Sequence, residues 1–330
     1  MLSLSLCLAI LVTLTFVYVK AAISKSSVND LVLNQYMENG ELAQMTYSSR
    51  LINKCSPCLA FLVPGCIHHD ANTTSSDSKG NNDEQFKSSK IVLCGNNNGN
   101  MGIMIRCKPL TSTLRKPHVT IKSDYNLVFS GVGFEADVSK VLGHIKETIE
   151  SHLFTFGEVP PSAKLVSSSS AYLTKGLYQE MEDAFARPLA ASLLLLAVES
   201  VRNNKKRDNF KVVLKEVLHT GLVTQSTMST LGSLVEDTDV LNKIKTKITS
   251  YCTTMRETMQ QTGYIDGFIT LLRDILLLLD EHMAKKHDEA QMEYELFMMD
   301  SKGHKWSLPS PRASQDLILQ RLREHMNPSV

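Results

Sequence analysis

Five residues in the first quarter of the chain have the types and spacing of a metal site. Cys55 and Cys58 form a Cys-x-x-Cys pair, and Cys66, His68 and His69 follow shortly after. Two thiolates and a later Cys/His pair are ligands that a tetrahedral zinc ion accepts. However, no second Cys-x-x-Cys follows at zinc-finger spacing, and alternation along a strand sends neighbouring side chains to opposite faces. The sequence therefore favours cysteines that share no metal, and it predicts no cofactor.

The apolar pattern around these residues predicts two short strands separated by a polar insertion. Residues 58–63 and 102–106 are apolar runs bounded by polar or turn-forming residues. Between them, residues 68–100 are rich in Asn, Ser, Asp and Gly, with one apolar island at 91–93. Such a composition buries too little surface to order itself, so we expect a surface loop with at most a short strand. The sequon at Asn72 lies in this insertion.

The middle of the chain has the clearest periodicity. Residues 126–129 form an apolar strand, which is expected to end at the turn Ser130-Gly131-Val132-Gly133. A helix is predicted over 136–152, because apolar residues recur on one of its faces: Val138, Val141, Leu142, Ile145 and Ile149.

A turn over 153–161 leads to a second helix, since Pro161 suits its first position. That helix is expected to end before Arg187, and 189–198 is a continuous apolar run typical of a strand buried on both faces. Further elements follow from the pattern: strands over 208–217 and 222–226, helices over 232–254 and 264–287, strands over 292–299 and 304–308, and a last helix from Pro311.

Composition is that of an ordinary globular protein. The 330 residues are 21% charged and 43% hydrophobic, with a net charge of +1, so nothing indicates nucleic-acid binding. Seven cysteines are an odd number and too scattered for a disulfide scaffold, which indicates thiols in a reducing compartment.

The first 22 residues point to a different compartment. Residues 2–19 carry no charge, and their length lies between a signal-peptide core and a spanning helix. Three interpretations stay open: a signal peptide cleaved near Val19-Lys20-Ala21, a membrane anchor, or an artefact of the gene model. Lys20 and Lys25 follow the apolar run and no cation precedes it, so an anchor would leave the body of the protein in the cytoplasm.

The order over 130–198 of a Ser-Gly-Val-Gly turn, two helices and an apolar strand led by Arg-Pro resembles that of 20S proteasome alpha subunits, the type-2 subunit most closely. Residues 39–48 are similar to the alpha-subunit signature Gly-Arg-Leu-x-Gln-Val-Glu-Tyr-Ala, with matches at Gly40, Leu42, Gln44 and Tyr47. The positions that differ are Glu41, Met45, Thr46 and Ser48. The resemblance spans about 27–326, apart from the insertion.

The resemblance implies an α+β fold, the four-layer αββα sandwich of N-terminal-nucleophile hydrolases. In that family the signature segment opens a helix that lies across the top of the sandwich and fills the cleft of a catalytic subunit. The residues themselves predict a helix with Leu42, Met45 and Leu51 on one face, flanked by Ala43 and Ile52.

The resemblance also implies that the subunit is not an enzyme. Catalytic relatives use an N-terminal Thr freed by cleavage after Gly, with its own amine as the base. The chain contains no Gly-Thr dipeptide. Gly65-Cys66 is the nearest substitute, but Cys66 follows the strand over 58–63, whereas the nucleophile must begin that strand.

A structural and gating role in the alpha ring is what the resemblance implies, with other alpha subunits, the beta ring and activators as partners and no small-molecule substrate. Ungapped alignment puts the family's gate cluster on Asn29, Asp30, Glu38 and Tyr47, of which Asp30 and Tyr47 match. The activator-pocket Lys falls at Pro117, between the candidate cations Lys116 and His118.

This role places the protein in cytoplasm and nucleus, in ubiquitin-dependent protein degradation. The alternative is a secreted or anchored paralogue outside the proteasome, acting as a Cys-dependent hydrolase of the same fold or as a binding protein.

Overall fold

A computed structural model describes residues 37–38, 42–69, 91–94, 100–109, 127–178, 188–201, 209–257, 261–285, 292–307 and 319–320. Within these ranges the protein is a mixed α+β structure with two large antiparallel sheets. The first sheet has the order β11 (Lys305–Ser307), β10 (Met292–Asp300), β4 (Asn100–Pro109), β1 (Cys58–Pro64) and β9 (Met228–Leu231). The second has the order β5 (Leu127–Gly133), β6 (Ala191–Val201), β7 (Asn209–Val217) and β8 (Val223–Ser226). A short pair, β2 (Cys66–His69) and β3 (Ile91–Cys94), forms a third sheet.

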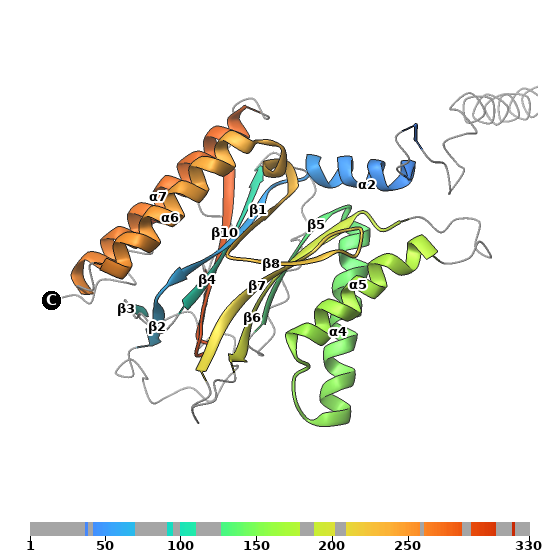
Figure 1. Cartoon of the computed structure of the whole chain (residues 1–330), viewed down its shortest axis with the longest axis horizontal. Coiled ribbons are helices and arrows are strands. Elements are labelled where there is room, and N and C mark those ends of the chain that lie inside the picture. The colour runs from blue at the N-terminus through green and yellow to red at the C-terminus, as the bar shows by residue number, and fades with distance from the viewer. Residues whose placement is uncertain are drawn as a thin grey trace, which may run out of the picture.

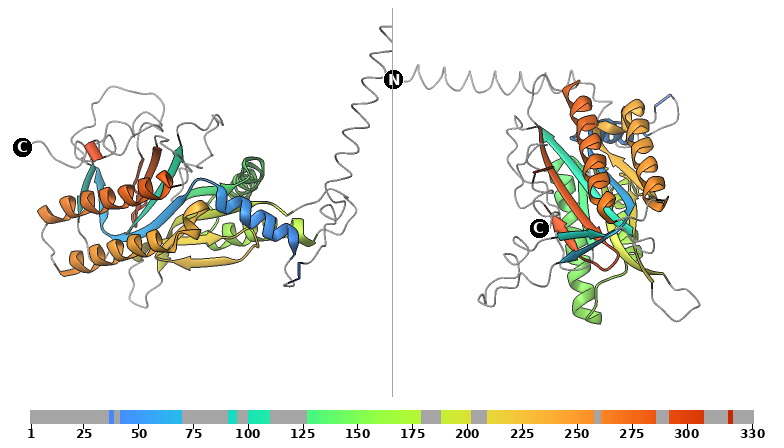
Figure 2. Two further views of the ribbon diagram at one scale, coloured as in Figure 1. Left: turned by 90° about the horizontal axis from the view of Figure 1, so that it is seen from above. Right: turned by 90° about the vertical axis from the view of Figure 1, so that its left-hand side faces the viewer.

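Each large sheet is covered by its own helix pair (Figure 1). Helices α6 (Thr238–Glu257) and α7 (Gln261–Ala284) lie side by side against the five-stranded sheet (Figure 2). Helices α4 (Glu135–Phe156) and α5 (Ser162–Tyr178) pack on the four-stranded sheet. Helix α2 (Ala43–Lys54) and the 3₁₀ helix η3 (Gly232–Glu236) contact each other at one end of the sheets.

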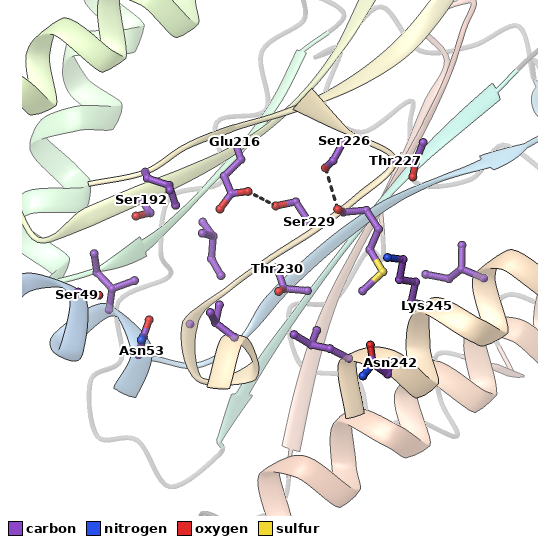
Figure 3. A pocket seen from close by; sticks show the side chains of 18 of the residues that line it. Ser49, Asn53, Ser192, Glu216, Ser226, Thr227, Ser229, Thr230, Asn242 and Lys245 are labelled. Atoms are coloured by element: carbon purple, nitrogen blue, oxygen red, sulfur yellow. Dashed lines mark hydrogen bonds between the residues drawn. The ribbon is translucent and has the colours of Figure 1, made fainter. Parts of the chain in front are cut away.

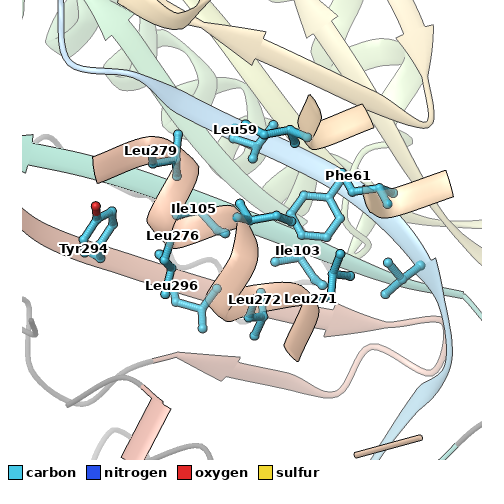
Figure 4. Packing of buried hydrophobic residues seen from close by; sticks show 14 of the residues in the cluster. Leu59, Phe61, Ile103, Ile105, Leu271, Leu272, Leu276, Leu279, Tyr294 and Leu296 are labelled. Atoms are coloured by element: carbon cyan, nitrogen blue, oxygen red, sulfur yellow. The ribbon is translucent and has the colours of Figure 1, made fainter. Parts of the chain in front are cut away.

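Strand alternation gives β1 one face for the helices and one for the other sheet. Leu59 and Phe61 point toward α7, into a cluster with Ile103, Leu272 and other apolar residues (Figure 4). The next side chains along the strand, Cys58 and Ala60, belong to a different cluster, which contains residues of both sheets. Burial on both faces explains why the strand reads as an unbroken apolar run.

The same alternation in β6 places the two sheets against each other. Leu193 and Leu195 pack toward α4 and α5, whereas Leu194 and Leu196 pack toward the five-stranded sheet. A side-chain amide also joins the sheets: Asn100 Nδ2 donates to Val212 O at 2.7 Å, and Val212 N donates to Asn100 Oδ1 at 2.8 Å.

Most of the expected elements are confirmed. The helix predicted over 136–152 is α4, and its five predicted apolar residues are buried. The strand predicted over 189–198 is β6, and those predicted over 58–63, 102–106, 208–217, 222–226, 292–299 and 304–308 are β1, β4, β7, β8, β10 and β11. The helical stretch over 232–254 is η3 and α6, and that over 264–287 is α7. The apolar island of the insertion pairs as β3 with β2.

The turn predicted at Ser130-Gly131-Val132-Gly133 is wrong, because β5 continues through it. Its glycines serve close packing instead: a Cβ on Gly131 would lie 2.5 Å from Val138 Cγ1, and one on Gly133 would lie 2.0 Å from Ala190 O. The turn predicted over 153–161 starts too early, since α4 runs to Phe156 and Gly157 caps it with φ 70°. Strand β9 is missing from the sequence-based expectations.

The face predicted for α2 is also wrong. Its buried residues are Ala43, Ser48 and Ile52, whereas Leu51 is 39% exposed. The end of α5 near Arg187, the last helix apart from 319–320, and the leader over 1–22 lie outside the described residues. In the part of the chain that the structure describes, no helix combines the length and hydropathy needed to cross a membrane.

Candidate functional site

Helices α2 and η3 close the end of the sheets at which β1 begins. The main-chain N–H of Ser233 in η3 donates to Cys55 O, just after α2, at 2.9 Å. Gly232 makes this close approach possible: its φ is 82°, and a Cβ there would lie 2.6 Å from Ser56 O. We call the residues beneath this junction, around Cys58, the covered end.

The thiols of the covered end are inert by burial. Cys58 is 0% exposed, and its Sγ donates to Ser130 Oγ at 3.3 Å. Cys55 Sγ is 3.4 Å from Gly133 O. Burial raises the pKa of both thiols, so neither supplies a thiolate at neutral pH. Burial also lowers the pKa of the neighbouring Arg106 guanidinium.

The five residues of the candidate metal site lie in two places along the chain: before and at the start of β1, and in β2. The two thiols of the Cys-x-x-Cys pair have separate partners, and Cys66, His68 and His69 belong to β2. Among the described residues, no three His, Cys, Asp or Glu side chains gather closely enough to hold a metal ion. Cys66 also follows β1, so it does not begin that strand.

A Ser-His-Asp arrangement lies behind η3 and was not expected from the sequence. His282 Nε2 is 3.1 Å from Ser233 Oγ, and His282 Nδ1 is 2.9 Å from Asp237 Oδ2. The hydrogen bond from His282 lowers the pKa of the Asp237 carboxyl. These are the contacts of a serine hydrolase triad.

The Ser-His-Asp arrangement is buried, which argues against a catalytic role. Ser233 is 3% exposed and His282 is 1% exposed, so a substrate carbonyl has no route to the hydroxyl. The main-chain N–H of Ser233, which an oxyanion hole would use, already donates to Cys55 O. The arrangement therefore fixes η3 and the start of α6 to α7.

A second buried arrangement, Ser162 with Lys215 and Glu199, is equally structural. Lys215 Nζ is 2.8 Å from Ser162 Oγ and 2.5 Å from Glu199 Oε1, and Ser162 Oγ also donates to Glu199. Burial alone would raise the pKa of Glu199, but hydrogen bonds from Lys215 and Ser162 lower it overall. The Lys215 ammonium is held between Ser162 Oγ and Glu199 Oε1, so the three side chains tie α5, β6 and β7 together.

An open groove lies on the other side of the α2–η3 junction. It has a volume of about 740 Å³ and is bounded by α2, the residues of β8 and β9, η3 and α6 (Figure 3). Glu216 lies in its wall, where its Oε2 accepts from Ser229 Oγ at 2.5 Å and from Thr224 Oγ1 at 3.2 Å. Burial lowers the pKa of His219, also in the wall, so this side chain is neutral at pH 7.

The structure describes three of the four matching signature positions. Leu42 precedes α2, Gln44 is half-buried on its first turn, and Tyr47 is 52% exposed. The remaining predicted positions lie outside the described residues: Asp30, Gly40, Asn72, Lys116 and His118.

The groove and the Ser-His-Asp arrangement have no signal in the sequence. Thr230-Leu231-Gly232-Ser233 contains no motif, and His282 is one residue in a long apolar helix. Only the pairing of β9 with β1 and the packing of α7 bring these residues together.

No protein-family model matches the chain, and no curated protein matches it.

Proposed function

We propose that the chain is a non-catalytic, ring-forming subunit of the proteasome alpha type, nearest the type-2 subunit. In this proposal the two sheets and their helix pairs form the four-layer αββα sandwich of N-terminal-nucleophile hydrolases. The element order supports it. After α2, β1 and β4, with the β2–β3 pair inserted between those two strands, come β5, two helices, four strands, η3, two helices and a strand pair.

The observation that carries the proposal is the covering of β1 by the chain that precedes it. A hydrolase of this fold needs a free amine and a nucleophile at the start of β1. Here α2 comes before β1, η3 holds the α2–β1 connection through Cys55 O, and Cys58 is 0% exposed. This arrangement suits a subunit that closes its own cleft and acts through contacts with neighbours.

Partners follow from this role. Other alpha subunits would contact the chain head-to-tail, as heterologous contacts do in a closed ring. The beta ring would lie beneath, and activators would dock above. Asp30 and Tyr47 are the candidate gate residues, and Lys116 and His118 are the candidate cations for an activator carboxylate. The role assigns the protein to ubiquitin-dependent degradation in cytoplasm and nucleus.

Native purification of the endogenous protein, tagged at its C-terminus, tests the proposal. Mass spectrometry of the purified material should show other alpha and beta subunits in near-equal amounts with this chain. The N-terminal peptide should begin downstream of the apolar leader, with residues 30–47 retained. A protein that purifies alone, or carries a glycan at Asn72, would refute the ring role.

A further inference from the structure

The outer edge of β9 is open where it borders the groove. β9 is the last strand in the order of the five-stranded sheet, and β1 is its only partner strand among the described residues. Leu62 N donates to Thr227 O at 2.8 Å. In an antiparallel ladder, hydrogen-bonded and non-hydrogen-bonded pairs alternate, so Phe61–Met228 and Leu59–Thr230 are non-hydrogen-bonded pairs.

This register turns the main-chain groups of Met228 and Thr230 away from β1. Both residues line the groove. Ser226 Oγ donates to Met228 O at 2.8 Å, occupying one acceptor. The register gives Thr230 N–H and C=O no partner on β1, and in the part of the chain that the structure describes no other strand pairs with β9. An open pair of this kind is where another strand adds to a sheet.

Two side chains of opposite formal charge line the groove, Glu216 from β7 and Lys245 from α6, and no ion pair joins them in the described part of the chain. Glu216 forms no ion pair with a Lys or Arg of the described ranges. Its Oε2 accepts from the hydroxyls of Thr224 and Ser229, and Figure 3 shows the bond from Ser229. His219 is neutral at pH 7 because burial lowers its pKa. Because Glu216 is half-buried and outside any ion pair of the described residues, a cationic side chain of a ligand can pair with it.

A single occupant satisfies both features. A small cationic molecule would pair with Glu216 but leave the strand edge open. An extended peptide offers alternating N–H and C=O groups to Thr230 and carries side chains that reach the groove wall. The volume of about 740 Å³ accommodates several residues of such a segment.

We propose that the groove binds an extended segment of a partner protein as an added strand along β9, with a Lys or Arg side chain of that segment paired to Glu216. The edge of β9 supplies affinity through main-chain hydrogen bonds, and Glu216 selects the basic side chain. The binding site stands independently of membership in a proteasome ring.

Selection from a randomised library of synthetic nonapeptides on the immobilised full-length protein tests this proposal. We expect the selected peptides to share a Lys or Arg at one fixed position. Fluorescence anisotropy with the best peptide then gives its affinity. Replacing the basic residue of that peptide by norleucine should weaken binding at least about tenfold, without any change to the protein.

Two variants of the protein locate the site. Glu216→Gln should abolish the preference for the basic residue, and Thr230→Pro should weaken every peptide by removing the outward N–H while leaving the β1 pairing. Glu147→Gln, at an exposed position on α4, is the control and should bind like the parent protein. Thermal melts establish that each variant is folded.

Three results would overturn the proposal. One is a selection without a basic consensus. Another is unchanged affinity in both folded groove variants. The third is self-association that Glu216→Gln abolishes in analytical ultracentrifugation, because the occupant would then be a second copy of this chain.

Discussion

The covered end and the groove both border α2 and η3, yet their polar groups differ in exposure to solvent. In the covered end, Cys58 bonds to Ser130 and Ser233 bonds to His282, away from water. In the groove, Glu216 and the edge of Thr230 face open space. The covered end contains a Ser-His-Asp arrangement that is buried, whereas the groove is open and shows no such triad among the described residues. The two regions therefore differ in solvent access, although both contain residue types that could take part in catalysis.

The largest loss of stability is expected from adding a side chain at Gly133, the last residue of β5. Gly133 has φ 145°, and a Cβ there would lie 2.0 Å from Ala190 O, which belongs to the backbone and has little room to move. We expect Gly133→Ala to lower the free energy of unfolding by about 3 kcal/mol, measured by urea denaturation.

Gly143→Ala is the matched control for that substitution. Gly143 is in α4 and nothing lies within 4 Å of its Cβ position, so the change should stabilise the protein by about 0.5–1 kcal/mol. Equal losses at the two glycines would show that close packing at β5 is not the cause.

Ser233→Ala should have the next largest effect, and a structural one. The substitution leaves His282 Nε2 buried without its hydroxyl partner, at a cost of roughly 1–2 kcal/mol in urea denaturation. Ser167→Ala, at an exposed position on α5, should not destabilise the protein. A fluorophosphonate probe should leave Ser233 unlabelled in the native protein. Labelling of Ser233 would show that its hydroxyl is accessible and reactive, and would support a catalytic role.

Asp237 is the residue between η3 and α6, and its charge should make the stability of the protein depend on pH. The hydrogen bond from His282 lowers the folded-state pKa of this carboxyl, so its stabilisation is present above the ordinary Asp value and is lost as the pH falls through the folded pKa. Asp237→Asn should be less stable at pH 7, by under about 1 kcal/mol, because this carboxyl is partly exposed.

The gap in melting temperature between Asp237→Asn and the parent protein should narrow below about pH 4. Asp266→Asn, exposed on α7, serves as the control. A difference in melting temperature that widens as the pH falls would show that the Asp237 carboxylate does not stabilise the folded protein.

Periodicity predicted the elements whose packing is continuous and failed where packing is local. The helix over 136–152 was predicted with its buried face because five apolar residues, from Val138 to Ile149, repeat over about three turns of α4. The short helix α2 carries apolar residues on several sides, and its contact with η3 selects Ser48 and Ile52 over Leu51. Sequence period contains no information about that contact.

Small residues gave the most misleading signals. Glycines at 131 and 133 resemble a turn, but they allow α4 and the segment around Ala190 to approach β5 closely. Strand β9 reads Met-Ser-Thr-Leu and has no clear apolar alternation. Strand β9 forms because it pairs with β1, and this pairing has no signal in the sequence. The groove beside β9 therefore could not be predicted either.

The smallest effect on stability is expected in the groove itself. Glu216 is half-buried, and its bonding partners Ser229 and Thr224 are hydroxyls that an amide oxygen also satisfies. Glu216→Gln should therefore change the free energy of unfolding by no more than about 0.5 kcal/mol in urea denaturation. A loss comparable to that of Ser233→Ala would mean that the carboxylate holds β7, β8 and β9 together. The groove would then resemble the covered end. The carboxylate of Glu216 would have a structural role and would no longer indicate a ligand.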